Sequence, residues 1–220
     1  MISSNDTSHI SQQFDQELQD LKNHVLVMGG MVEKLVMDAS FALVNGDGEL
    51  AEQVQDTERN VDSLEMTIDE ECTQVIARRQ PTASDLRFVV AIAKMVSDLE
   101  RVGDEAEKIA KIALLLIDEG QSPRGYVEVR HISKHVSEML HDALDSFTRL
   151  DLELALSVMN EDKLVDSEYK SATRSLVTFM MEDTRNISSV LNVMWVLRAL
   201  ERIGDHSRNI AEHVIYMVKG

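Results

Sequence analysis

A six-residue sequence occurs twice in this chain, and each copy carries two carboxylates four residues apart. The first copy is Leu99-Glu-Arg-Val-Gly-Asp104, and the second is Leu200-Glu-Arg-Ile-Gly-Asp205. On a helix the two carboxylates of each copy lie on one face, where they repel each other and weaken the helix. The repetition of an unfavourable pair indicates that something positive, such as a metal ion, sits between carboxylates.

The composition favours helices over sheets. Of the 220 residues, 28% are charged and 44% are hydrophobic, whereas aromatic residues make up only 4% and prolines number 2. A chain of this length has room for two domains with modest cores. Its formal net charge of −17 argues against unaided binding to nucleic acid or anionic lipid.

Neither a targeting segment nor a membrane-spanning segment is expected. Residues 1–10 are polar and acidic and lack a basic region followed by an apolar core. The uninterrupted apolar run at residues 112–117, which no other run exceeds, is far shorter than the roughly 20 residues that cross a bilayer. The single cysteine, Cys72, excludes an intrachain disulfide and is expected to be a small buried side chain. These features predict a cytoplasmic protein without direct membrane insertion.

Apolar residues at helical spacing predict an all-α fold of six long helices. The expected helices run to about residue 45, from there to 80, from about 82 to 119, from 127 to 150, from 152 to 182, and from 188 to 218.

Breaks between these helices divide the chain into two similar halves. Pro81 ends the second helix, and Thr82 or Ser84 is expected to cap the third. Residues 120–125 form the only mid-chain stretch that resembles a linker. The pattern predicts two pseudo-symmetric three-helix bundles in tandem, residues 1–120 and 121–220.

The middle helix of each half carries a further acidic pair at the same spacing, Glu58 with Asp62 and Asp162 with Asp166. The midpoint between Asp62 and Glu100 is Pro81, and the corresponding midpoint in the second half, between Asp166 and Glu201, falls between Asp183 and Thr184. Antiparallel hairpins folded at these turns bring the acidic pairs of neighbouring helices level with each other, at the edge of the apolar stripe. The expected first carboxylate cluster is Glu58, Asp62, Glu100 and Asp104, and the expected second carboxylate cluster is Asp162, Asp166, Glu201 and Asp205.

Convergent carboxylates suit hard cations such as Mg²⁺, Mn²⁺, Ca²⁺ or iron. The glycine inside each repeat, Gly103 and Gly204, weakens a helix by about 1 kcal/mol relative to alanine, and its usual benefit is close approach of backbone or ligand. The alternative is that the acidic pairs are solvated surface, with Arg59, Arg101 and Arg202 as local salt-bridge partners.

Other metal-ligating or catalytic patterns are weak. A ferritin-like di-iron site requires a histidine three residues after a glutamate, where this chain has Gly103 and Gly204. His131 and His135 have ligand spacing but no evident carboxylate partner, so they are expected to be ordinary helix histidines. His206 faces away from Asp205. No acid–base–nucleophile constellation is present, which argues against an enzyme.

The combined motifs resemble the PhoU family, the accessory proteins of bacterial phosphate-specific transport. The resemblance rests on the residues 79–87, Arg-Gln-Pro-Thr-Ala-Ser-Asp-Leu-Arg, on the two copies of the repeat, on Asn209-Ile-Ala-Glu212 and on Met180-Met-Glu-Asp183, and it covers the chain from about Phe14.

This resemblance implies two three-helix bundles and a negative regulator of the phosphate regulon. Members are thought to connect the phosphate ABC transporter, through its ATPase subunit, to the phosphate-sensing histidine kinase, and a homodimer is expected. The family's paired E/D-x-x-x-D motifs bind multinuclear clusters of iron, magnesium or manganese. Carried over, the ligands are the eight residues of the two carboxylate clusters.

One departure from the family pattern distinguishes the two halves. The asparagine that often follows Gly-Asp by five residues is Asn209 in the second half but Lys108 in the first. A lysine there could reach the first carboxylate cluster and replace part of the cation charge, so the sequence favours metal in the second cluster. A metal-dependent enzyme or metal-storage bundle is the alternative to an adaptor, and a scaffold with solvated acidic pairs is a third possibility.

Overall fold

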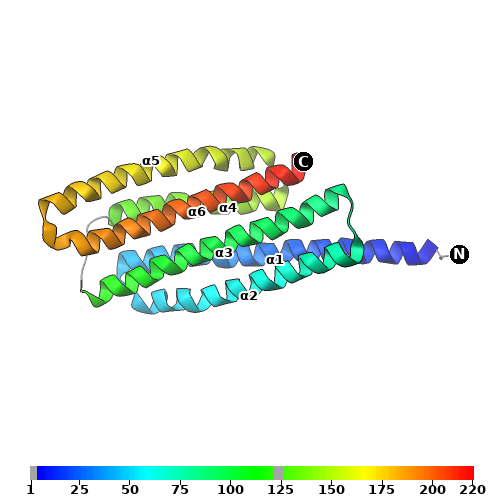
Figure 1. The fold of residues 1–220 in the computed structure, drawn as a ribbon, viewed down its shortest axis with the longest axis horizontal. Coiled ribbons are helices and arrows are strands. Elements are labelled where there is room, and N and C mark those ends of the chain that lie inside the picture. The colour runs from blue at the N-terminus through cyan, green and yellow to red at the C-terminus, as the bar shows by residue number, and fades with distance from the viewer. Residues whose placement is uncertain (1–3, 121–125) are drawn as a thin grey trace.

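The computed structural model describes residues 4–120 and 126–220, and these residues form long antiparallel helices without a strand (Figure 1). The expected linker falls largely on residues 121–125, which lie outside the described residues. The helices are α1 (Ser4–Asn45), α2 (Gly48–Arg79), α3 (Ala83–Asp118), α4 (Tyr126–Arg149), α5 (Leu152–Glu182) and α6 (Ile187–Lys219), with a short 3₁₀ turn, η1 (Thr184–Asn186), before α6. The all-α prediction and its helix boundaries are confirmed.

Turn chemistry explains where the helices stop. The chain reverses after α1 at Gly46, which has a φ of 69° that glycine adopts without strain. Asp47 then caps α2, because its carboxylate accepts from the backbone N–H of Leu50 at 3.0 Å. Thr82 occupies the N-cap position of α3 as expected, but its side chain makes no capping hydrogen bond.

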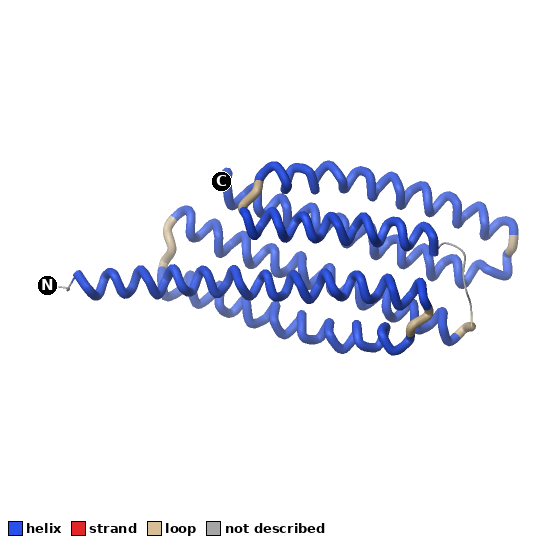
Figure 2. Tube along the Cα trace, turned by 180° about the vertical axis from the view of Figure 1, so that it is seen from behind, coloured by secondary structure: helices blue, strands red, loops and turns tan. Residues whose placement is uncertain are grey.

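Helices α1, α3, α4 and α6 pack on one another at the centre of the molecule, and α2 and α5 lie on opposite sides of it (Figures 1 and 2). Helices α1, α2 and α3 pack together, as do α4, α5 and α6, while α3 lies against α6 and α1 against α4. The first turns of α1 extend beyond the rest of the fold. Each carboxylate cluster therefore lies on an outer hairpin, α2–α3 or α5–α6.

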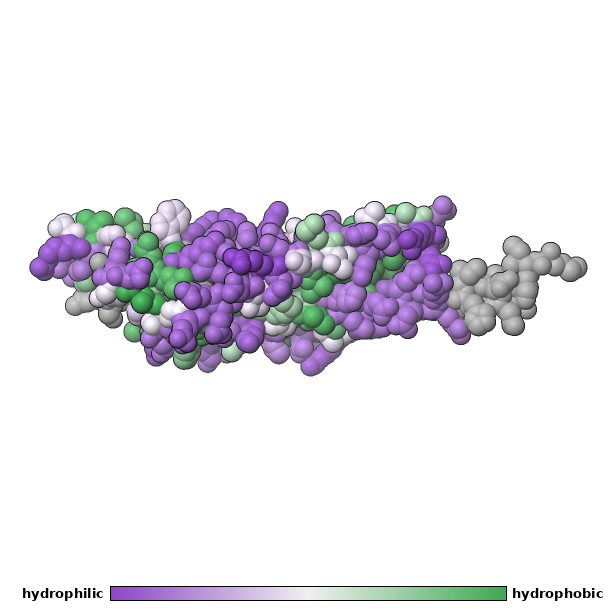
Figure 3. All heavy atoms as spheres, turned by 90° about the horizontal axis from the view of Figure 1, so that it is seen from below, coloured by the Kyte–Doolittle hydropathy of each residue, from purple (hydrophilic) through white to green (hydrophobic). Residues whose placement is uncertain are grey.

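A single apolar core runs through both sets of helices. Its largest fully buried side chains come from both halves of the chain, for example Met28 and Ile92 in the first half and Phe147 in the second. The surface seen in Figure 3 is mostly hydrophilic, with separate hydrophobic patches. In the described residues, no helix is both long and apolar enough to cross a bilayer.

Candidate functional site

The α2–α3 hairpin brings the first carboxylate cluster together in the register expected from the sequence. Glu58 is only 5% exposed and shares a hydrogen bond with Asp62 on the same helix, and the charge of Asp104 on α3 acts on it. Glu100 is half-buried and feels the charges of Asp104 and Asp62. All four carboxylates therefore lie close enough to repel one another across the seam between the helices.

Burial and mutual repulsion disfavour ionisation in this cluster. Burial, the hydrogen bond with Asp62 and the neighbouring negative charges raise the pKa of Glu58 to about 7. Burial, with Asp104 and Asp62 nearby, also raises the pKa of Glu100 above its ordinary value of 4.5. A cation bound among these oxygens would offset their mutual repulsion and favour the ionised form of both groups.

The raised pKa of Glu58 predicts a specific pH dependence of stability without added metal. A carboxyl with a higher pKa in the folded state stabilises the protein below its unfolded value of 4.5, and that contribution is lost as the pH rises through about 7. Glu58→Gln, which cannot ionise, should therefore stabilise the metal-free protein at pH 8 by on the order of 2 kcal/mol. The free energy of unfolding of this variant should also fall less steeply as the pH rises. Urea unfolding between pH 5 and pH 8, about the range over which the group titrates, measures this. The same dependence of the free energy of unfolding on pH in wild type and in Glu58→Gln would contradict the raised pKa of Glu58.

The second carboxylate cluster differs because arginines reach into it. Asp162 is buried and accepts from Arg208 at 3.1 Å, and Glu201 pairs with Arg198. Burial still raises the pKa of Glu201, with Arg198 opposing and Asp205 adding to the shift. Burial, with Asp162 nearby, raises the pKa of Asp205 in the same way. Asp166 pairs with Lys170 at 3.1 Å, so three of the four carboxylates here already have a cationic side chain as partner.

The sequence-based preference for the second cluster does not follow from these contacts. Lys108 hydrogen-bonds Glu105 at 3.1 Å and comes no closer than 4.0 Å to Asp104, so it compensates the first cluster weakly. Asn209 does not serve the second cluster but donates to Asp98 at 3.1 Å. The first cluster carries the more uncompensated negative charge, because arginines pair with carboxylates of the second cluster. The sequence did not indicate these arginine contacts.

The repeat glycines do not face a neighbouring backbone. A Cβ on Gly103 would meet Val61 at 3.5 Å, an ordinary contact, and one on Gly204 would meet Val165 at 3.4 Å. The expectation of close backbone approach is therefore wrong for both. Close approach of a ligand, the other benefit expected of a glycine there, stays a prediction.

The chemistry of the two clusters fits a hard cation, although the side chains do not surround an ion as they stand. Glu201 Oε2 is buried and has no hydrogen-bond partner, which leaves an oxygen lone pair for a cation. Within the described ranges, 4–120 and 126–220, no three histidine, cysteine or acidic side chains are arranged to hold a metal ion. Binding would need the carboxylates to rotate toward one another.

Three histidines contact carboxylates that the sequence did not indicate. The expectation that His131 and His135 lack a carboxylate partner is wrong, since Glu168 on α5 contacts both, at 3.3 and 3.2 Å. His206, predicted to face away from Asp205, does so and instead contacts Asp98 of α3.

Asp98 joins α3 to α6 through a buried polar cluster. Its carboxylate is 7% exposed and contacts His206 at 2.9 Å, His213 at 2.9 Å and Asn209 at 3.1 Å. Burial opposes ionisation of Asp98, but these three hydrogen bonds outweigh it and hold its pKa well below the ordinary value of 3.8. The cluster fixes the antiparallel register of α3 and α6, which the sequence repeat alone does not specify.

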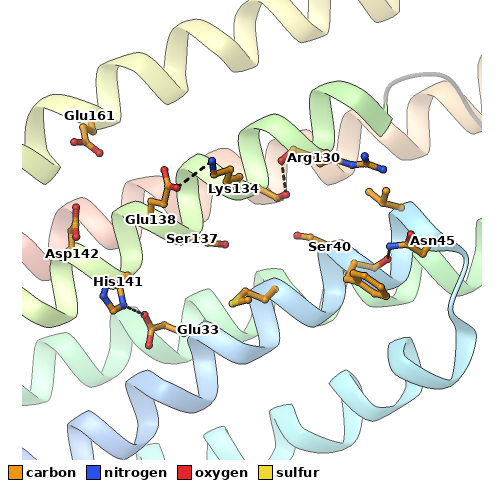
Figure 4. Close-up of a pocket in the computed structure, with 14 residues that line it drawn as sticks. Glu33, Ser40, Asn45, Arg130, Lys134, Ser137, Glu138, His141, Asp142 and Glu161 are labelled. Atoms are coloured by element: carbon orange, nitrogen blue, oxygen red, sulfur yellow. Dashed lines mark hydrogen bonds and ion pairs between the residues drawn. The ribbon is translucent and has the colours of Figure 1, made fainter.

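A large groove lies between α1 and α4 (Figure 4), with a volume of about 880 Å³. Its floor is apolar, and Met37 and Phe41 remain 61% and 56% exposed. Ser40 of α1 and Ser137 of α4 point toward one another across it, and the Ser40 hydroxyl is buried without a hydrogen-bond partner. The groove, referred to below as the α1–α4 groove, combines an apolar floor with polar edges, as protein-docking surfaces do.

A family model and the sequences of known proteins agree on the family of this chain. The family model for the PhoU domain matches residues 25–113 and again 129–214. The chain belongs to the PhoU family. The "Phosphate-specific transport system accessory protein PhoU homolog" of Pseudomonas aeruginosa is 59% identical over 97% of this chain and 88% of its own length. The Escherichia coli protein named "Phosphate-specific transport system accessory protein PhoU" is 46% identical over 100% of this chain and 91% of its own length.

Solved PhoU structures have the same fold. The crystal structure of PhoU from Pseudomonas aeruginosa matches with a TM-score of 0.92 at 58% identity, covering 94% of this chain and 99% of the other. The "phosphate transport system regulatory protein PhoU" of Streptococcus pneumoniae matches with a TM-score of 0.86 at 30% identity, covering 94% and 97%. Membership of the PhoU family identifies this chain as an accessory protein of phosphate-specific transport and not as an enzyme.

Proposed function

We propose that this protein is a cytoplasmic negative regulator of the phosphate regulon. It acts as an adaptor between the ATPase subunit of the phosphate ABC transporter and the phosphate-sensing histidine kinase. Support comes from PhoU membership and from relatives named as accessory proteins of phosphate transport. An adaptor acts through protein contacts, so it needs an exposed surface that a partner can cover.

The α1–α4 groove is the observation that carries this proposal. Met37 and Phe41 expose large apolar side chains, which are the usual anchors of a protein interface. Charged groups of both signs surround them, including the Glu33–His141 pair at 2.9 Å and the Lys134–Glu138 pair at 3.6 Å. Such a rim selects a partner by its charge pattern, while the apolar floor supplies most of the affinity.

Charges placed in the α1–α4 groove should therefore weaken partner binding. Met37→Glu combined with Phe41→Glu should weaken binding of the ATPase subunit or the kinase sensor region by at least about 2 kcal/mol, roughly 30-fold, because each anchor would have to bury a charge. Titration calorimetry with each purified partner measures this. The matched control is Met66→Glu on α2, where the methionine is 71% exposed but lies outside the groove.

The cellular readout of the same variants is expression of phosphate-regulated genes. The groove variant should express them even when phosphate is plentiful, and the Met66→Glu control should repress them normally. We also expect a homodimer, which light scattering detects. If the groove charges convert a dimer to a monomer and leave both partner affinities unchanged, the groove is a dimer interface and its docking role is overturned.

We also propose that the two carboxylate clusters bind Mg²⁺, Mn²⁺ or iron and that the cation fixes the hairpins for partner contact. The support is the uncompensated charge around Glu58, the orphaned Glu201 Oε2 and the hard oxygen donors. When bound, the ion would supply positive charge that holds α2 to α3 and α5 to α6, with no redox or hydrolytic step.

Removing the ligands of one cluster tests the metal proposal. Glu201→Ala with Asp205→Ala should lower bound metal by about half at unchanged helix content, since each half holds one cluster. The equivalent Glu100→Ala with Asp104→Ala variant should do the same. Elemental analysis of protein purified without chelator measures both. Unchanged stoichiometry in either variant would contradict the assignment of that cluster, and metal-free wild-type protein would favour the scaffold alternative.

A further inference from the structure

A second groove lies between α3 and α6 and has a different chemistry from the α1–α4 groove. Its volume is about 520 Å³, which is in the range of small-molecule sites. The side chains that line it are Glu105, Lys108, Lys111, Ile112, Trp195, Arg198, Ala199 and Arg202. It joins the two halves of the chain, and below it is called the α3–α6 groove.

Four cations line the α3–α6 groove in a protein whose net charge is −17. Glu105 is the only acidic residue of the lining, and its side chain is 5% exposed, beneath Arg202 at 2.6 Å and Lys108 at 3.1 Å. One carboxylate thus shares two cations and leaves a net positive charge. This surplus would raise the local concentration of an anion that the rest of the surface repels.

The remaining two cations have partners outside the lining. Lys111 contacts Glu107 at 2.6 Å, but its side chain is 55% exposed, so water screens this pair and an anion can compete for it. Arg198 pairs with Glu201, and its side chain is 45% exposed. Counting these neighbours and Asp104, which lies 4.0 Å from Lys108, four cations have four carboxylates as partners. The positive charge is concentrated in the lining of the α3–α6 groove itself, where Glu105 is the single carboxylate beside four cations.

Trp195 stands at one end of the α3–α6 groove. It is the only tryptophan of the chain and is 65% exposed, although tryptophan side chains are usually well buried. Since α3 and α6 are antiparallel, Trp195 lies toward Ile112 and Arg202 toward Glu105. Seven residues of helix separate Trp195 from Arg202, about 10 Å. An exposed indole face at that distance from guanidinium groups suits a ligand with a planar ring at one end and anionic groups at the other.

We propose that the α3–α6 groove binds a nucleotide. The base stacks on Trp195, and the phosphates accept hydrogen bonds from Lys108, Lys111, Arg198 and Arg202, with the guanidinium groups as bidentate donors. Because the ligand bridges α3 and α6, binding stabilises one arrangement of the two halves. This site is separate from the α1–α4 groove, so it does not depend on the proposed adaptor contacts.

Trp195 makes the test direct, because its fluorescence reports on this groove alone. The probes are ATP, adenosine and inorganic phosphate, each added to wild-type protein in the presence of EDTA so that metal does not contribute. ATP should change the emission saturably, while adenosine and inorganic phosphate should bind at least about tenfold more weakly, since each offers one half of the recognition. No saturable change with ATP, or equal affinity for adenosine or phosphate, would overturn the proposal.

Charge variants decide whether the binding involves these cations. Lys108→Ala with Lys111→Ala should weaken ATP binding by about tenfold or more, because two phosphate partners are lost. The control is Lys134→Ala, a lysine with a 76% exposed side chain that lies in the α1–α4 groove. Equal affinity in the double variant and the control would overturn the assignment. Trp195→Ala, followed by calorimetry, should also weaken ATP binding while leaving the unfolding midpoint unchanged, which separates stacking from a folding defect.

Discussion

Asp98→Ala is expected to destabilise the protein by about 3–5 kcal/mol, the largest effect of any single polar substitution described above. The carboxylate is buried between α3 and α6 and is the shared partner of His206, Asn209 and His213. Its removal leaves three polar side chains without their acceptor in a place that water reaches poorly. Because both halves of the molecule contact this point, the loss weakens the junction of the two halves.

Urea unfolding at neutral pH measures this loss. The matched control is Asp56→Ala, since that carboxylate is 76% exposed and pairs only with Arg59, so less than about 0.5 kcal/mol should change. The stabilisation from Asp98 is present above its unfolded pKa of about 3.8 and disappears as the pH falls through the lower folded value. The difference between wild type and Asp98→Ala should therefore shrink in strong acid. A loss no larger than that of the control would show that the cluster is not structural.

Much of the fold could be predicted from the sequence because its determinants are local. Apolar spacing marks the helices, and Gly46 and Pro81 stop two of them. Equal distances from Pro81 then place Asp62 level with Glu100, and the repulsion between these groups in the structure agrees with that register. Hairpin register follows from counting residues, since a turn fixes which positions of its two helices meet.

Contacts between the halves could not be predicted in this way. The linker does not fix how α3 meets α6, so no count of residues brings Asp98 to His206 or Glu105 to Arg202. The pairing of Arg208 with Asp162 was missed for a different reason, because a long side chain reaches across a seam that backbone register locates only roughly. The one signal in the sequence for a contact between the halves was the aspartate at position 98, directly before Leu99 of the repeat.

Phe147→Ala is the second substitution with a large expected effect, about 3–5 kcal/mol of lost stability. Among the residues whose burial the structure describes, Phe147 has the largest fully buried side chain, and it lies on α4 in the common core. Lys22 of α1 lies 5.7 Å from the centre of its ring and donates to the carbonyl of Thr148 at 2.9 Å. Truncation would therefore leave a cavity where α1 and α4 meet and remove the ring that Lys22 covers.

Phe41→Ala is the matched comparison, because the same chemical change is made on an exposed side chain. Phe41 is 56% exposed in the α1–α4 groove, so its loss should change the free energy of unfolding by less than about 1 kcal/mol while weakening binding of the partner. Phe147→Ala should have the opposite effect. Its unfolding midpoint should be lower than that of wild type, and its affinity for the partner should be normal at temperatures where it is folded. If both variants lost stability equally, Phe41 would belong to the core. If neither affected binding, the α1–α4 groove would not be the docking surface, because an anchor residue could be removed at no cost to affinity.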